Sequence, residues 1–79
     1  MSDSREYIRG VIKALGCTQK RFCEHAGIHP VHLAEFLSKT RNLSRENCLR
    51  LEKAYGIPFI KLMSMQISEW YELNKDKQL

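Results

Sequence analysis

The chain has 79 residues, enough for one small domain and too few for two of typical size. Hydrophobic residues make up 43% of it and charged residues 28%, and no apolar run approaches the roughly 20 residues needed to cross a bilayer. The polar opening MSDSREY predicts no signal peptide, so we expect a cytoplasmic protein. The formal net charge is +4, and residues 1–50 hold all of that excess, with nine Lys and Arg against five Asp and Glu. A bias of this size favours a nucleic-acid partner only slightly.

Three cysteines, Cys17, Cys23 and Cys48, have neither the even number nor the spacing of a disulfide framework. We therefore expect reduced thiols that serve as small hydrophobic side chains. Three histidines between residues 25 and 32 lie near Cys23, but the chain has no C-x-x-C pair, so we expect no metal and no cofactor. A Ser/His/Asp set, paired carboxylates and a phosphate-binding glycine loop are also missing. We predict that the protein is not an enzyme and has no small-molecule substrate.

Apolar residues recur at helical spacing along the chain and strand-type alternation is missing, which predicts an all-α fold of five helices. N-cap residues mark the helix starts and glycines mark the ends. The expected caps are Asp3 (with Glu6 completing a capping box), Thr18, His29 ahead of Pro30, and Ser44; the expected stops are Gly16, Gly27 and Gly56. We expect one domain over residues 1–73 and a frayed tail over 74–79.

In each expected helix the apolar residues repeat at helical spacing and so share one face. These faces are Tyr7, Ile8, Val11, Ile12 and Leu15 in the first helix; Phe22, Cys23 and Ala26 in the second; Cys48, Leu51 and Tyr55 in the fourth; and Phe59, Leu62, Met63, Ile67, Trp70 and Leu73 in the fifth, which begins after Ile57-Pro58. The last helix carries more apolar area than so small a core should absorb, so we predict a dimer interface at Met63, Ile67, Trp70 and Tyr71. The alternative is that these side chains all fold back onto the core.

Residues 18–38 have the features of a helix-turn-helix. Cys23 is the small residue in the middle of the motif's first helix, the second of the chain, and Gly27 supplies the left-handed turn. Leu33 and Phe36 are the apolar anchors that would hold the motif's second helix, which begins at Pro30, against the core and leave its far side free.

The outward face of this second helix is the predicted base-reading surface. A step of 100° per residue turns Val31, Glu35 and Ser38 away from the anchors. Val31 suits contact with a thymine methyl group, although single exposed apolar residues are common on protein surfaces. Glu35 would be repelled by phosphates, so it must accept from a cytosine amine, pair with a nearby cation such as Lys39, or have a purely surface role.

Donors that suit phosphates lie on both sides of this helix. Thr18 and Gln19 open the preceding helix, where free N–H groups and the positive end of the dipole favour an anion, and Lys20 follows them. After the recognition helix comes a polar loop at 39–42 that would clamp the DNA backbone. Its residues are Lys39, Thr40, Arg41 and Asn42. If no recognition helix preceded it, a polar loop of this kind would be equally well explained as solvated surface.

The run TQKRFCEHAGIHPVHLAEFLSKTRNLS, followed by ENCLRLEKAYGIP, resembles the Cro/repressor (XRE) family of helix-turn-helix DNA-binding proteins over residues 5–62. The resemblance implies a compact five-helix bundle of the lambda-repressor-like type, with a phosphate held at Gln19. It also implies that bases are read by His29, Pro30, Val31, His32 and Glu35. His29 is more simply explained as a helix cap, and His32 could contact a base, a phosphate or only solvent. The family often has Asn-Gly after the recognition helix and amides on it, whereas this chain has Ser38-Lys39 and no such amides.

The stretch LSRENCLRLEKAYGIPFIKLMSMQ is also similar to HigA-type antitoxins, although Leu62 stands where that family has an aromatic residue. This narrower resemblance implies a dimer that represses its own operon and binds a toxin ribonuclease, so a toxin protein is a further expected partner.

We therefore predict a sequence-specific transcriptional regulator that binds double-stranded DNA. It would act as a homodimeric repressor on an operator with two half-sites about 34 Å apart. The alternative is a protein-interaction module that keeps the fold without specific DNA binding. Glu35 and the missing amides favour this alternative, whereas the 39–42 loop and the one-sided charge favour DNA binding.

Overall fold

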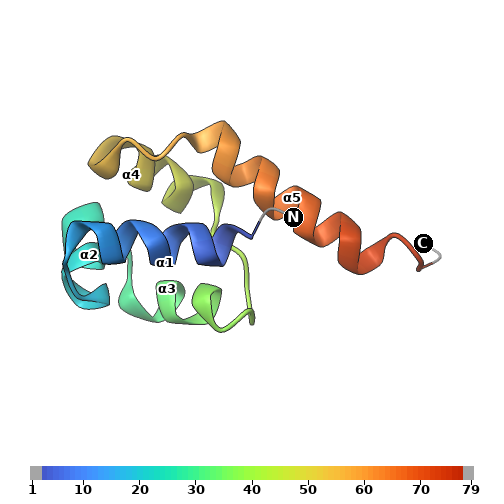
Figure 1. The fold of residues 1–79 in the computed structure, drawn as a ribbon, viewed down its shortest axis with the longest axis horizontal. Helices are drawn as coiled ribbons and strands as arrows, with labels where there is room; N and C mark the ends of the chain where they lie inside the picture. Colours follow the sequence, from blue (N-terminus) through green and yellow to red (C-terminus); the bar gives the residue numbers. More distant parts are fainter. Residues whose placement is uncertain (1–2, 78–79) are drawn as a thin grey trace.

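The computed structural model describes residues 3–77, which form five α-helices and no strand (Figure 1), as the helical spacing predicts. The helices are α1 (Ser4–Leu15), α2 (Gln19–Ala26), α3 (Pro30–Leu37), α4 (Arg45–Tyr55) and α5 (Phe59–Asn74). No helix within residues 3–77 is long and apolar enough to span a membrane.

Local sequence signals begin the first four helices where they were expected, and the expected glycines end α1, α2 and α4. The side chains of Asp3, Thr18, His29 and Ser44 each accept a hydrogen bond from a backbone N–H of the first helical turn. Gly16, Gly27 and Gly56 take left-handed backbone conformations, with φ of +67°, +76° and +71°. Of the expected capping box only the contact made by the Asp3 side chain forms, because the Glu6 carboxylate pairs with Arg9 at 3.0 Å.

The core lies where α2 packs on α3 and α4, and where α5 packs on α4 and α1. Its largest fully buried side chains are Phe22, Phe36, Ile8, Leu33, Leu51 and Leu62. Tyr55 closes one side: its ring stacks on Phe22 with centroids 4.5 Å apart, and its hydroxyl donates to the Phe22 carbonyl at 2.9 Å. The bundle therefore joins α2 and α4 through both apolar and polar contacts.

The apolar residues in the second half of α5 stay outside the core, so the alternative that they all fold back onto it is wrong. The buried residues of α5 are Leu62 and Gln66, whereas Ile67, Trp70 and Leu73 are 61%, 52% and 76% exposed. The reason is visible in Figure 1, where α5 continues beyond the end of the bundle and the molecule reaches 41 × 22 × 21 Å. Leu15, expected on the inner stripe of α1, is likewise 51% exposed, since it lies in the last turn of that helix, beyond the buried Ile8 and Ile12.

The end of α5 extends slightly past the predicted domain boundary. The helix includes Asn74, whose side-chain amide donates to the Trp70 carbonyl at 2.7 Å, and Lys75 then pairs with Glu72 at 3.0 Å. Residues 78–79 of the predicted tail lie outside the described residues, as do residues 1–2 of the expected polar start.

Candidate nucleic-acid interface

The turn between α2 and α3 is built by backbone geometry at Gly27. The N–H groups of Gly27 and Ile28 both donate to the Cys23 carbonyl, at 2.8 and 3.0 Å, which ends α2. Ile28 is buried, and Leu33 and Phe36 of α3 are completely buried, so α3 is anchored along one side. In Figure 1, α3 lies along the lower edge of the bundle with its opposite side uncovered.

The uncovered side of α3 presents the residues expected to read bases. Val31 is 53% exposed, His29, Pro30, His32 and Ser38 are also exposed, and Glu35 is half-buried. Nδ1 of His29 accepts from the Val31 N–H at 3.1 Å, so a neutral His29 ring carries its proton on Nε2 and can donate outward. The predicted base-reading residues are therefore all at least partly exposed, on α3 or at its two caps.

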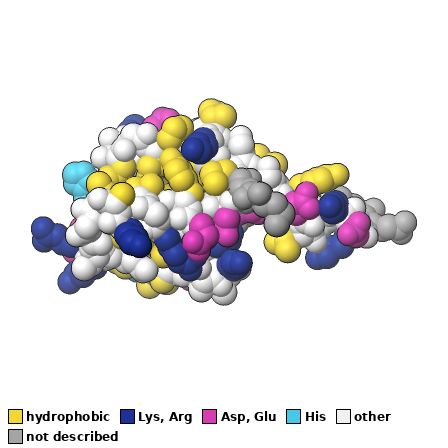
Figure 2. Space-filling model, viewed as in Figure 1, with side chains coloured by type: hydrophobic (Ala, Val, Ile, Leu, Met, Phe, Trp, Pro, Cys, Tyr) yellow, Lys and Arg dark blue, Asp and Glu magenta, His cyan; other side chains and the backbone are white. Residues whose placement is uncertain are grey.

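At the start of α2, the predicted phosphate contacts form a second exposed group. Thr18 Oγ1 accepts from the Arg21 N–H at 3.1 Å, which fixes the cap. Gln19 and Lys20 are exposed beside it. In Figure 2, Lys and Arg side chains lie over the left and lower parts of the bundle, with Asp and Glu side chains among them.

The loop after α3 is shaped by contacts to a single backbone carbonyl. The Glu35 carbonyl accepts from the Thr40 N–H at 3.0 Å, from Thr40 Oγ1 at 3.0 Å and from Ser38 Oγ at 3.1 Å. Lys39, where the related family often has glycine, takes a left-handed conformation with φ of +68°. Thr40 therefore holds the loop, and Lys39 accepts backbone strain to turn the chain.

Glu35 pairs with Arg41, whereas the sequence suggested Lys39 as its cation. The distance from Arg41 Nη1 to Glu35 Oε1 is 3.0 Å, and the two side chains are 50% and 42% exposed. The left-handed turn at Lys39 and the two Thr40 contacts reverse the chain and bring Arg41 back beside α3.

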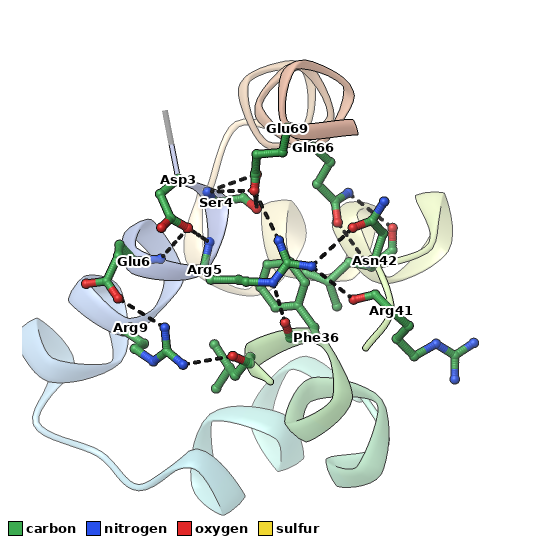
Figure 3. Close-up of polar contacts among 12 residues, drawn as sticks. Asp3, Ser4, Arg5, Glu6, Arg9, Phe36, Arg41, Asn42, Gln66 and Glu69 are labelled. Carbon is green, nitrogen blue, oxygen red and sulfur yellow. Dashed lines mark hydrogen bonds and ion pairs between the residues drawn. The ribbon is translucent and has the colours of Figure 1, made fainter. Parts of the chain in front are cut away.

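The main feature that sequence reasoning missed is the buried Arg5, only 8% exposed (Figure 3). Its Nε donates to the Phe36 carbonyl at 2.7 Å, and its guanidinium lies 4.9 Å from the Phe36 ring centre. Its other nitrogens donate to the Glu69 carboxylate at 3.1 Å, to Asn42 Oδ1 at 3.3 Å and to the Arg41 carbonyl at 3.4 Å. Arg5 therefore joins α1, the end of α3, the 39–42 loop and α5.

Two further polar contacts lie beside the contacts of Arg5, and together they form the Arg5 cluster. Ser4 donates through Oγ to the Glu69 carboxylate at 2.7 Å, and Arg9 donates to the Leu37 carbonyl at 2.8 Å. Asn42, expected to contact phosphate, has its side-chain oxygen engaged by Arg5. The only sequence signal was two arginines four residues apart in α1, which places Arg5 and Arg9 on one side of that helix.

The remaining titratable groups of interest lie in the core. Burial raises the pKa of the Cys23 thiol and raises that of Cys48 to about 11, although a hydrogen bond from Gln66 acts in the opposite direction on Cys48. Burial also raises the pKa of Tyr55. Within residues 3–77, no group of three or more His, Cys, Asp or Glu side chains is arranged to hold a metal ion.

Two short helices joined by a glycine turn, with the second anchored on one side and exposed on the other, define a helix-turn-helix. A family model described as helix-turn-helix matches residues 8–62 of the chain. The protein belongs to this Cro/C1-type (XRE) helix-turn-helix family, whose members are DNA-binding transcription regulators and not typically enzymes. Neither a curated protein nor a solved structure gives a significant match.

Proposed function

We propose that this regulator is a sequence-specific repressor that binds as a homodimer to an operator with two half-sites. The observation that carries the proposal is the division of α3 into a buried side, with Leu33 and Phe36 completely covered, and an uncovered side with Val31 53% exposed. An α-helix presented in this way fits the major groove of B-DNA. The base-reading residues would be His29, Pro30, Val31, His32, Glu35 and Ser38.

The backbone contacts in this proposal come from both ends of the helix-turn-helix. Thr18, Gln19 and Lys20 would meet one phosphate at the start of α2, where free N–H groups and the helix dipole favour an anion. Exposed Lys39 would meet another beyond α3. These contacts position α3 without reading sequence.

Binding is tested by fluorescence anisotropy, with a duplex chosen by selection from a random pool and a scrambled duplex, across a salt series. We expect tighter binding to the selected duplex and a steep fall in log affinity with log salt. Val31→Ala should weaken mainly binding to the selected duplex, and Lys20→Ala should weaken both. Equal and salt-insensitive binding to the two duplexes would instead identify an interaction module.

The dimer interface in this proposal is the projecting half of α5. Ile67, Trp70 and Tyr71 are 61%, 52% and 58% exposed, and Met63 is half-buried beside them. A groove of about 200 Å³ separates α5 from the loop before α4. Its lining residues are Asn42, Leu43, Met63, Gln66, Ile67 and Trp70. A second copy would cover this apolar surface and set two α3 helices at the half-site spacing of about 34 Å.

Sedimentation velocity over a range of concentrations tests the dimer. We expect the wild-type chain to dimerise and Trp70→Ala to shift it toward monomer and weaken operator binding. Leu49→Ala, which truncates an apolar side chain 41% exposed on α4, is the matched control and should leave the dimer intact. A wild-type chain that binds its selected duplex as a monomer would remove dimerisation from the proposal.

The antitoxin role is the narrowest part of the proposal and is supported by the likeness of residues 43–66 to HigA-type antitoxins. Coexpression with the product of the adjacent gene tests it. A stable complex and protection from that product's ribonuclease activity would support it, and failure of both would leave a regulator without a toxin.

A further inference from the structure

Arg41 belongs to the loop after α3, but its side chain pairs with a residue of α3. Its guanidinium lies 3.0 Å from Glu35, which is one helical turn after the exposed Val31. Its backbone carbonyl accepts from buried Arg5 at 3.4 Å. In Figure 3 the Arg41 side chain extends away from the Arg5 cluster. Arg41 is therefore held at its backbone by Arg5 and at its side chain by Glu35.

This pairing makes a phosphate a poor partner for Arg41. The adjacent Glu35 carboxylate cancels most of the attraction that the guanidinium would exert on an anion, and it would itself be repelled by the phosphate. A neutral acceptor does not compete with the carboxylate in this way. The O6 and N7 atoms of guanine in the major groove are neutral acceptors, and arginine binds them together through two N–H groups.

We propose that Arg41 reads a guanine in each half-site and that Glu35 is the positioning residue that holds its guanidinium for this contact. The inference rests on the proposed DNA-binding function and replaces the phosphate contact suggested for Arg41 by sequence. Carboxylate pairing leaves the remaining N–H groups of Arg41 free to donate to the base. It also limits the rotation of a long, flexible side chain before DNA arrives, which lowers the entropic cost of the contact.

The geometry also predicts where the guanine lies. Val31 and Glu35 are four residues apart on α3, a separation along the helix of about 6 Å. The base-pair rise of B-DNA is about 3.4 Å, so the guanine should lie about one or two base pairs from the thymine beside Val31. A selected half-site should therefore contain a closely spaced T and G.

The test compares the half-sites selected from a random duplex pool by the wild-type chain, Arg41→Ala, Arg41→Lys and Glu35→Gln. We expect one G·C position to lose its preference in all three variants, by about tenfold in relative affinity, while the other positions keep theirs. Glu35→Gln should also raise affinity for scrambled DNA, because it removes a negative charge. Lys20→Ala is the matched control and should weaken every duplex while preserving all preferences.

The two ways of failing are distinguishable. If the wild-type chain selects no sequence, the proposed function fails and this inference fails with it. If the wild-type chain selects a half-site and Arg41→Ala retains every base preference while binding more weakly, the DNA-reading function stands. Arg41 is then a phosphate contact and the inference is wrong. Circular dichroism confirms that each variant is folded, as expected for two side chains that are about half exposed.

Discussion

The reading edge of the molecule and the projecting half of α5 are both exposed, but their exposure has different causes. The reading edge comprises α2, α3 and residues 38–42, and its backbone is held by caps and by donors from Arg5, Arg9 and Thr40. The projecting half, residues 67–74, is a plain helix with exposed Ile67 and Trp70. A rigid frame with solvated side chains suits recognition of DNA, whereas unpaired apolar side chains suit a protein partner.

The two regions are connected through the partly buried ion pair between Arg5 and Glu69. Arg5 binds the last turn of α3 and the 39–42 loop, and Glu69 of α5 accepts from Arg5 and Ser4. The orientation of α5 therefore depends on the same cation as the end of the recognition helix. Substitutions at Arg5, in the core and on each region should therefore separate the rigid edge from the projecting helix.

Arg5→Ala should cause the largest loss of stability. It removes the buried partner of Glu69 and leaves the Phe36 carbonyl without its side-chain donor, which should cost about 4 kcal/mol in the free energy of unfolding. Arg9→Ala, which removes a more exposed contact to Leu37, should cost only about 1 kcal/mol. Urea denaturation followed by circular dichroism measures both. Equal losses for the two variants would show that the Arg5 cluster does not tie the regions together.

The core between the two regions should lose stability in alkali. Burial raises the pKa of Cys48 from 9.0 to about 11, so above pH 9 the unfolded chain loses this proton while the folded chain keeps it. Unfolding then becomes easier as pH rises, and the contribution reaches roughly 2 kcal/mol by pH 11. Thermal unfolding from pH 8 to 11 in a reducing buffer should show a steeper decline for the wild-type chain than for Cys48→Ala. Identical slopes would contradict the assignment.

Gln66 and Ile67 offer a direct comparison of the inner and outer sides of α5. The Gln66 side chain exchanges two hydrogen bonds with Leu43, accepting from its N–H at 2.7 Å and donating to its carbonyl at 3.2 Å. Gln66→Leu should cost about 2 kcal/mol although it adds hydrophobicity, because both Leu43 groups lose their partner. Ile67→Gln should leave the monomer's stability nearly unchanged. Denaturant midpoints, measured at protein concentrations too low for dimers to form, compare the two variants. A larger loss of stability for Ile67→Gln than for Gln66→Leu would contradict the assigned inner and outer sides of α5.

Lys39→Gly should have a small effect of the opposite sign, because it should raise the free energy of unfolding. Lys39 has φ of +68°, a conformation that costs a residue with a side chain about 1 kcal/mol and costs glycine little. We expect a gain of about 0.5 to 1 kcal/mol, partly offset by the greater freedom of glycine in the unfolded chain. Ser38→Gly is the matched control, because Ser38 has φ of −86° and should gain nothing. Thermal unfolding of both variants decides whether this loop is strained.

The sequence by itself determined the helices and the helix-turn-helix. Each cap, each glycine stop and the anchors Leu33 and Phe36 follow from local hydrogen bonding and from the period of the apolar residues, which act within one or two turns. The outward direction of Val31 followed in the same way. Tertiary structure alone decided that Gln66 is buried, and it decided against the alternative that Trp70 folds back onto the core, because the bundle ends before α5 does. It also decided that Arg5 is buried and that Glu35 pairs with Arg41. Those contacts join residues from different helices and loops, and helical periodicity carries no information about which polar groups will meet.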